Sequence, residues 1–149
     1  MFVGEICNRQ VVICGRDDSI QNAAELMRDN HVGDVIVVEH KEGKHFPIGI
    51  LTDRDIVIEV LAEGVNNLDD IAVNDVMSSE LISVKEDDYI IETIEQMRDR
   101  GIRRVPVVNQ EGSLEGILAV DDAIELVAEL LSNLVKLFKH EFNREIKTR

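Results

Sequence analysis

The chain contains no tryptophan, and aromatic residues make up only 3% of its 149 residues. Apolar residues nevertheless reach 44%, so the interior must be built from Val, Ile, Leu, Met and Ala, the usual filling of small α/β layers. Long apolar runs are also missing, since none approaches the roughly 20 residues needed to cross a bilayer. The first residues show no basic segment followed by a long apolar core. We therefore expect a cytoplasmic protein that makes no membrane contact.

Cysteine is scarce, because Cys7 and Cys14 are the only two. Their spacing fits neither a zinc site nor a disulfide framework, so both are expected to be small buried hydrophobes. No metal site is predicted, because no ligand set with a neighbouring carboxylate is formed by His31, His40, His45 and His140. The sequence also lacks a nucleophile with a base and an orienting acid, and it lacks a glycine-rich phosphate loop. These absences argue against an enzyme.

Positive charge is in short supply, with 16 Lys and Arg against 30 Asp and Glu and a formal net charge of -14. Nucleic-acid binding depends on neutralising phosphates with Lys and Arg, so nucleic acid is not an expected partner. Residues 136–149 are the exception, because basic residues outnumber acidic ones there. Such asymmetry marks either a tail with a separate task or the solvated face of a helix.

What the sequence does contain is an internal repeat, in which residues 3–38 align with residues 73–108. The first copy shares identical residues with the second at Asp17, Asp18, Ile20, Glu25, Met27, Arg28, Asp29, Val35, Val37 and Val38. After a small shift, Gly49-Ile50-Leu51 aligns with Gly116-Ile117-Leu118, and Asp55 aligns with Asp122. The shift falls in the polar stretch 39–45, where we expect a longer hairpin connection in the first copy.

Each copy is predicted to form a short strand, a helix, two strands joined by a turn, and a second helix. The predicted strands are residues 11–13, 34–38 and 46–51 in the first copy, and 81–84, 104–108 and 114–118 in the second. Acidic pairs at 17–18 and 87–88 can cap the first helix of each copy.

The repeats predict a mixed α/β fold with two β-α-β-β-α units. Neither unit can bury its apolar faces alone at this size, so the two sheets should pack together around a pseudo-two-fold axis. The polar segment 63–70 is the natural linker. We therefore expect units at residues 1–66 and 67–131, followed by a helical tail at 132–149.

The last helix can run without Pro or Gly from about Val120 to about Lys147. An apolar stripe at helical spacing is formed by Val127, Leu131, Leu134, Phe138, Phe142 and Ile146. A helix that outruns its domain usually needs something to pack on. A second subunit is the simplest candidate, which predicts a homodimer; the alternative is an amphipathic helix folded back on its own domain.

Two motifs in this order resemble the CBS-domain family, named after cystathionine beta-synthase and usually found as a tandem pair called a Bateman module. The first motif is the segment 49–55, Gly-Ile-Leu-Thr-Asp-Arg-Asp, and the second is the segment 101–108, Gly-Ile-Arg-Arg-Val-Pro-Val-Val. The resemblance extends from about Val3 to about Leu131 and leaves only the tail outside it.

Thr52 and Asp55 are expected where a strand ends and a helix begins. A carboxylate there can accept both hydroxyls of a ribose, Thr52 and the helix N-terminus can take phosphate oxygens, and Arg54 supplies a charged donor. In the CBS family the equivalent Asp binds ribose and the equivalent Thr contacts phosphate. The alternative is a capping box, in which Thr52 and Asp55 only terminate the helix.

The second copy departs from the motif, because Ala119 replaces the Thr and Asp121 stands beside Asp122. Two carboxylates there would repel a phosphate. We therefore expect the second cleft to be empty, weaker, or selective for a ligand with less charge.

The crossed arrangement of the CBS family completes each cleft with residues of the other copy. It implies a primary cleft of Thr52, Arg54, Asp55, Ile82, Ser83, Arg104 and Val105. It implies a secondary cleft of Val12, Asp34, Val35, Arg103, Ala119, Asp121 and Asp122. The alternative for the adjacent Arg103 and Arg104 is that they form surface ion pairs in a very acidic protein.

The resemblance implies a non-catalytic regulatory module with no catalytic cofactor. Its expected ligand is an adenosine-containing nucleotide such as AMP, ADP, ATP, S-adenosylmethionine or an NAD-like molecule. The alternative is a ligand-free dimeric adaptor that acts through protein contacts. CBS pairs commonly regulate an enzyme or transporter fused to them, and because none is seen in this sequence, the target is expected to be a separate protein.

Overall fold

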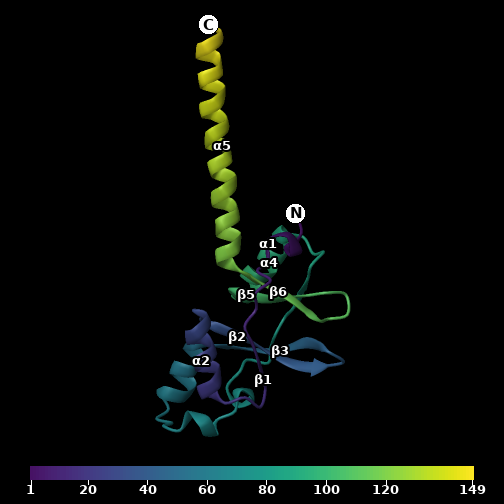
Figure 1. Ribbon diagram of the computed structural model, residues 1–149, viewed down its shortest axis with the longest axis vertical. Helices are drawn as coiled ribbons and strands as arrows, with labels where there is room; N and C mark the ends of the chain where they lie inside the picture. The colour runs from purple at the N-terminus through teal and green to yellow at the C-terminus, as the bar shows by residue number, and fades with distance from the viewer.

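The computed structural model describes residues 1–149 and contains two three-stranded sheets, each with its own helices (Figure 1). The first repeat consists of β1 (Ile13–Gly15), α2 (Ile20–Asn30), β2 (Asp34–Lys41), β3 (Lys44–Thr52) and α3 (Asp53–Ile56), which continues into the π-helical turn η1 (Val57–Leu61). The second consists of β4 (Val84–Lys85), α4 (Ile90–Arg100), β5 (Arg104–Val108), β6 (Leu114–Ala119) and α5 (Val120–Thr148). Short helices α1 (Val3–Ile6), η2 (Leu68–Asp70) and η3 (Val73–Asp75) precede the two repeats. The predicted mixed α/β fold with an extended last helix is confirmed.

The two sheets share one topology. In each, the first strand is parallel to the second and the second is antiparallel to the third. The register shifts between Val37 and Val38 in the first sheet and between the equivalent Val107 and Val108 in the second. The internal repeat is therefore preserved down to the position of a bulge.

The expected longer hairpin connection in the first repeat is wrong, because the extra residues lengthen the strands instead. β2 and β3 stay paired as far as Lys41 and Lys44, and only Glu42 and Gly43 form the turn. Both turn residues have positive φ, at 51° and 75°, which is the geometry that joins two strands with two residues.

Each repeat has its own apolar core, and each core borrows a residue from the segment that precedes the other repeat. The first core contains Val73 together with Ile20, Val35, Leu51 and Val60, all almost fully buried. The second contains Val3, Val84, Val105, Val107 and Leu118 among others. The Val73 N–H donates to the Asp18 carbonyl at 2.8 Å, and the Val3 N–H donates to the Asp88 carbonyl at 2.9 Å. The repeats are thus joined by exchanged segments.

The exchange continues along the third strand of each sheet. Ser78 forms a bridge with Ile50 in β3, and Asn8 forms the equivalent bridge with Ile117 in β6. The glycine before each bridged isoleucine allows this approach. A Cβ on Gly49 would lie 2.9 Å from the Ser78 carbonyl oxygen, and one on Gly116 would lie 2.8 Å from the Asn8 carbonyl oxygen. The glycine of the Gly-Ile-Leu motif therefore leaves room for the crossing segment.

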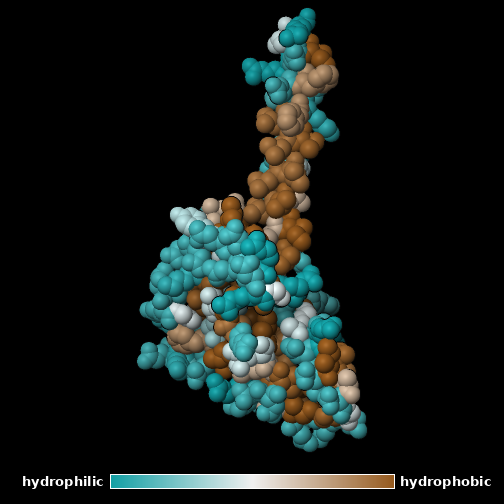
Figure 2. Space-filling view, turned by 180° about the vertical axis from the view of Figure 1, so that it is seen from behind, coloured by the Kyte–Doolittle hydropathy of each residue, from teal (hydrophilic) through white to brown (hydrophobic).

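Helix α5 leaves the second repeat and projects away from both sheets (Figure 1). None of its residues is buried, and every residue from Val127 to the C-terminus is exposed. The space-filling view shows apolar side chains along much of this projection (Figure 2). No helix of the protein combines the length and apolar character needed to span a membrane.

Candidate functional site

The site lies where four strand ends meet. Asp34 at the start of β2 pairs with Thr52 at the end of β3, and Arg104 at the start of β5 pairs with Ala119 at the end of β6. The Arg104 Nε lies 2.9 Å from the Asp34 Oδ1, so an ion pair links the two repeats at this edge. A cleft lies on each side of this pair, and Arg104 lines both.

The primary cleft has a volume of about 390 Å³. It is lined by Ile50, Thr52, Asp53, Arg54, Ile102, Arg103 and Arg104. Three of the residues predicted for it, Thr52, Arg54 and Arg104, are brought together there. Arg103, which was assigned to the secondary cleft, lines this one instead, and the cleft therefore combines three guanidinium groups with one carboxylate.

Thr52 and Asp55 form a reciprocal capping box at the start of α3. The Asp55 N–H donates to the Thr52 Oγ1 at 3.1 Å, and the Thr52 N–H donates to the Asp55 Oδ2 at 2.9 Å. Asp55 is half-buried and does not line the cleft wall itself. It lies next to the cleft, because its hydrogen-bond partner Thr52 is part of the wall. Capping thus accounts for one carboxylate oxygen, and the second oxygen makes no hydrogen bond within the protein.

The remaining predicted residues of the primary cleft lie elsewhere. Val105 is fully buried in the second core, and Ile82 packs against that core. Ser83 is exposed just before β4 and does not line the cleft. The structure therefore does not bring these three residues to Thr52.

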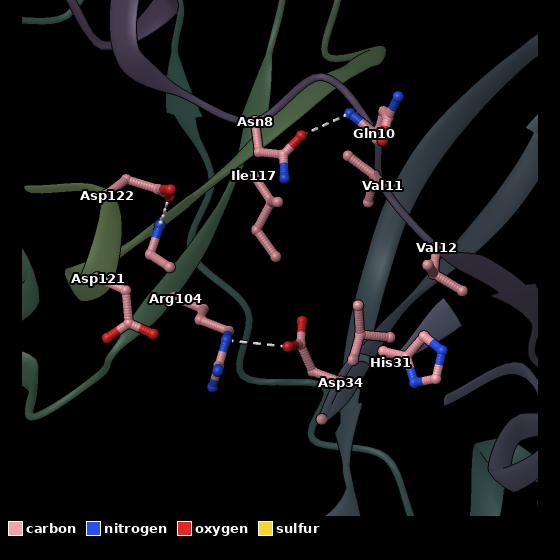
Figure 3. A pocket seen from close by; sticks show the side chains of 13 residues that line it. Asn8, Gln10, Val11, Val12, His31, Asp34, Arg104, Ile117, Asp121 and Asp122 are labelled. Carbon is pink, nitrogen blue, oxygen red and sulfur yellow. Dashed lines mark hydrogen bonds and ion pairs between the residues drawn. The ribbon is translucent and has the colours of Figure 1, made fainter. Parts of the chain in front are cut away.

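The secondary cleft has a volume of about 270 Å³ and contains five of the seven residues predicted for it (Figure 3). These five are Val12, Asp34, Ala119, Asp121 and Asp122. Val35 is fully buried in the first core, because it points to the face of β2 opposite to that of Asp34. Figure 3 shows Arg104 reaching toward Asp34, with Asp121 and Asp122 on its own side of the cleft.

Sequence reasoning missed several residues of the secondary cleft, which are Asn8, Gln10, Val11, His31, Val32, Gly33, Ile117 and Arg104. Asn8 and Gln10 lie on the segment that crosses from the second repeat to β1. The repeat alignment contained a signal for this crossing, because it places Asn8 over Ser78 and Ile117 over Ile50. The sequence predicts a strand at residues 11–13, whereas β1 begins only at Ile13.

The two clefts differ in charge. Three arginines face one aspartate in the primary cleft, whereas one arginine faces three aspartates in the secondary cleft. The Asp122 Oδ2 accepts a hydrogen bond from the Ala119 N–H at 2.8 Å, which repeats the Asp55 contact without a threonine hydroxyl to return it. The primary cleft therefore suits an anionic group, and the secondary cleft suits a neutral or cationic one.

Burial raises the pKa of Asp34 above its ordinary value, while Arg104 opposes this shift and Asp53 adds to it. Only 10% of the Asp34 side chain is exposed. The carboxylate that links the repeats is thus costly to ionise, and its charge depends on Arg104.

No group of three or more His, Cys, Asp or Glu side chains in the structure is arranged to hold a metal ion. Cys7 and Cys14 are free thiols, and Cys14 is buried as expected, whereas Cys7 is half-buried.

Comparison with known proteins gives the family. The CBS domain family model matches residues 3–62 and 73–129, so two copies cover most of the sequence. The chain belongs to the CBS domain family. All residues that line the two clefts lie within the matched ranges, and the outer part of α5 lies outside them.

Relatives of the CBS pair occur in archaea and bacteria. The protein MK0525 of Methanopyrus kandleri is 35% identical over 144 residues, which are 97% of this chain and 71% of the relative. The CBS domain-containing protein YhcV of Bacillus subtilis is 36% identical over 120 residues, which are 80% of this chain and 81% of the relative.

A similar solved structure is the CBS domain protein PAE2072 from Pyrobaculum aerophilum, which was determined in complex with AMP. It superposes with a TM-score of 0.72 at 27% identity and covers 82% of this chain and 89% of its own. A CBS pair of the same fold thus accommodates an adenosine nucleotide.

Proposed function

We propose that this CBS pair is a non-catalytic regulatory module that binds a phosphate-bearing adenosine nucleotide in the primary cleft. The observation that carries the proposal is the convergence of Arg54, Arg103 and Arg104 on one cleft. Arginine donates charge-assisted, often bidentate hydrogen bonds to phosphate oxygens. The AMP complex of the Pyrobaculum relative supports the same ligand class.

The remaining parts of a nucleotide have matching groups nearby. The side chains of Ile50 and Ile102 form an apolar part of the cleft wall, against which a base can lie. The Thr52 hydroxyl can donate a hydrogen bond to the ligand while it accepts from the helix. The second oxygen of Asp55 can accept from a ribose hydroxyl, because an ionised carboxylate has about four lone-pair sites and the cap uses one.

We propose a different role for the secondary cleft, whose carboxylates Asp34, Asp121 and Asp122 repel phosphates. It binds a nucleotide weakly or takes an adenosine compound of lower charge, such as the sulfonium cation S-adenosylmethionine. Arg104 is the only Lys or Arg among its lining residues, and its charge is already paired with the carboxylate of Asp34.

The test is a calorimetric titration with AMP, ADP, ATP and adenosine at low and high salt. We expect each phosphate-bearing ligand to bind at least about tenfold more tightly than adenosine, with an advantage that shrinks as salt screens the arginines. Arg103→Ala should remove much of this advantage, whereas Arg28→Ala, an exposed change in α2, should not. Adenosine binding as tightly as AMP would contradict the role given to the arginines.

We also propose that the module works as a homodimer in the cytoplasm. Large apolar side chains on α5 are more than half exposed, and contiguous apolar patches on soluble proteins mark interaction sites. The two free thiols fit a reducing compartment. Sedimentation should give about twice the 16.8 kDa monomer mass. A dimer that binds none of the four ligands would favour a ligand-free dimeric adaptor instead.

A further inference from the structure

The two repeats end differently, although their sequences align there. In the first repeat α3 turns through η1 and packs back on α2, so that Ile56 and Val60 are 7% and 1% exposed in the first core. The alignment of Asp55 with Asp122 makes Ala123 and Val127 their equivalents. α5 continues straight instead, and Val127 is 54% exposed. The second repeat thus lacks the apolar cover that the first one has.

The missing cover leaves an open groove between α4 and the root of α5. The groove has a volume of about 380 Å³ and is lined almost entirely by apolar side chains, among them Ile94, Met97, Ile102, Ala123, Ile124 and Val127. Its lining includes one charged residue, Arg98. An apolar groove of this kind gains free energy when apolar side chains of a partner fill it.

The groove continues without interruption into an exposed apolar face on α5. We call this face the α5 stripe, and it consists of Ile124, Val127, Leu131, Leu134, Val135, Phe138, Phe142 and Ile146. Each of these side chains is more than half exposed. Together they present on the order of 1,000 Å² of surface, which meets the roughly 800 Å² that each partner of a standard interface contributes. The stripe therefore exposes about as much surface as one partner of a standard interface buries.

Charge along α5 decides the direction of the partner helix. The root carries four acidic residues, Asp121, Asp122, Glu125 and Glu129, and no basic one. The outer half carries Lys136, Lys139, Arg144, Lys147 and Arg149 against Glu141 and Glu145, so basic residues outnumber acidic ones there. A second α5 running antiparallel places its basic half beside the acidic root, whereas a parallel one places like charges together. Antiparallel pairing is therefore favoured by electrostatics.

Side-chain size along the α5 stripe fits the same arrangement. If two helices cross antiparallel with the centre between Leu134 and Val135, then Leu131 faces Phe138 of the partner subunit. Val127 then faces the partner's Phe142, and Ala123 faces the partner's Ile146. The large residues of one tip thus meet the small residues that line the groove of the other subunit.

We propose that α5 pairs antiparallel with the α5 of a second copy, and that Phe142 and Ile146 of the partner subunit fill the groove between α4 and α5. The two bodies then lie at opposite ends of the helix pair, because each α5 projects away from its own sheets (Figure 1). The partner's tip supplies the cover that Ile56 and Val60 supply within the first repeat. This arrangement rests on the proposed homodimer and is independent of nucleotide binding.

The test measures distances between spin labels in the full chain by pulsed electron resonance. Single cysteines replace Ser132 or Asn143, which are both exposed. At about 1.5 Å per residue, antiparallel pairing offsets the two labels along the helix axis by about 8 Å for Ser132→Cys and about 26 Å for Asn143→Cys. The distance at 143 should therefore be longer by on the order of 10 Å. Wild-type protein taken through the same labelling reports any signal from Cys7 and Cys14.

Equal distances at the two positions would indicate parallel helices and overturn the proposal. A dimer by sedimentation with no distance within range at Ser132→Cys would place the interface elsewhere and also overturn it. A second pair of variants tests the groove: Phe142→Asp should shift the protein to monomer at micromolar concentration, and Asn143→Asp should not. Monomeric wild-type protein would defeat the proposed homodimer itself, and nucleotide titration of that protein would still test the primary cleft.

Discussion

Asp34 and Arg104 occupy equivalent positions in the two repeats, and their side chains meet in an ion pair of 2.9 Å. Each is the first residue of the central strand of its sheet. The pseudo-two-fold relation therefore brings together two positions that carry opposite charges. Because Arg104 also lines both clefts, a change in this pair affects the junction of the repeats and the walls of both clefts.

Arg104→Ala should destabilise the protein by about 1 to 3 kcal/mol at pH 7, because it leaves the buried carboxylate of Asp34 without its partner. Burial already raises the Asp34 pKa, and loss of Arg104 should raise it further. Because the pKa of Asp34 is higher in the folded protein than in the unfolded protein, the protein loses stability as the pH rises from the ordinary Asp pKa through the raised pKa of the folded state. The destabilisation should therefore be larger at pH 7 than at pH 4.5, as measured by urea unfolding.

The pseudo-two-fold relation supplies a control for this variant. The exchange Asp34→Arg with Arg104→Asp should restore part of the stability that Arg104→Ala loses, since the two positions are equivalent. An equal destabilisation by Arg104→Ala at both pH values would show that lost packing, rather than the unpaired carboxylate, causes the effect.

Gly49→Ala and Gly116→Ala should each cost about 1 to 3 kcal/mol of unfolding free energy, because a methyl group would collide with the crossing backbone at Ser78 or Asn8. Gly15→Ala is the matched control in β1, since its Cβ would lie 3.7 Å from the nearest atom. The melting temperatures of Gly49→Ala and Gly116→Ala should lie well below that of wild type. The melting temperature of Gly15→Ala should lie close to that of wild type. A Gly49→Ala protein as stable as wild type would contradict the close approach.

The fold was largely predictable because the repeat is visible in the sequence. The spacing of Ile20, Ala23 and Met27 predicts α2, and the β-branched run at 34–38 predicts β2; both elements are present. The exchange of Val3 and Val73 between the cores was not predicted, because burial in a distant repeat leaves no local pattern.

The candidate site was harder to predict than the fold. The motif located Thr52, Arg54, Asp121 and Asp122 at strand ends, since a strand end is a local property. The crossing of the chain between the two sheets decides which cleft Arg103 lines. It also places Asn8 and Gln10 in the secondary cleft. The alternation of side chains along a strand could not reveal this.

Cys14 should be almost unreactive toward thiol reagents at pH 8. Burial, together with the nearby Asp18, raises its pKa to about 12, and burial also raises the pKa of the Cys7 thiol. The thiolate is the reacting species, so native protein should react far more slowly than protein in denaturant. Because the pKa of the Cys14 thiol is higher in the folded protein than in the unfolded protein, the free energy of unfolding should fall as the pH rises above about 9. Two thiols that react as quickly in native protein as in denaturant would contradict this burial.

Truncation after Leu131 should leave nucleotide affinity nearly unchanged and abolish self-association. Every residue of the two clefts lies before this point, whereas five of the eight residues of the α5 stripe lie after it. Sedimentation and calorimetry on the same preparation separate the two effects. Loss of nucleotide binding with the dimer intact would contradict this division of roles.

Nucleotide binding in the primary cleft is tested most directly by titrating AMP into Asp55→Asn and Asp122→Asn. The two variants are matched, because each carboxylate accepts the same backbone hydrogen bond at the start of its helix and an asparagine oxygen can keep it. We predict that Asp55→Asn weakens AMP binding at least about tenfold, through the lost ribose acceptor. Asp122→Asn should leave AMP binding unchanged or slightly tighter. Equal losses in the two variants, or a greater loss in Asp122→Asn, would place the nucleotide outside the primary cleft.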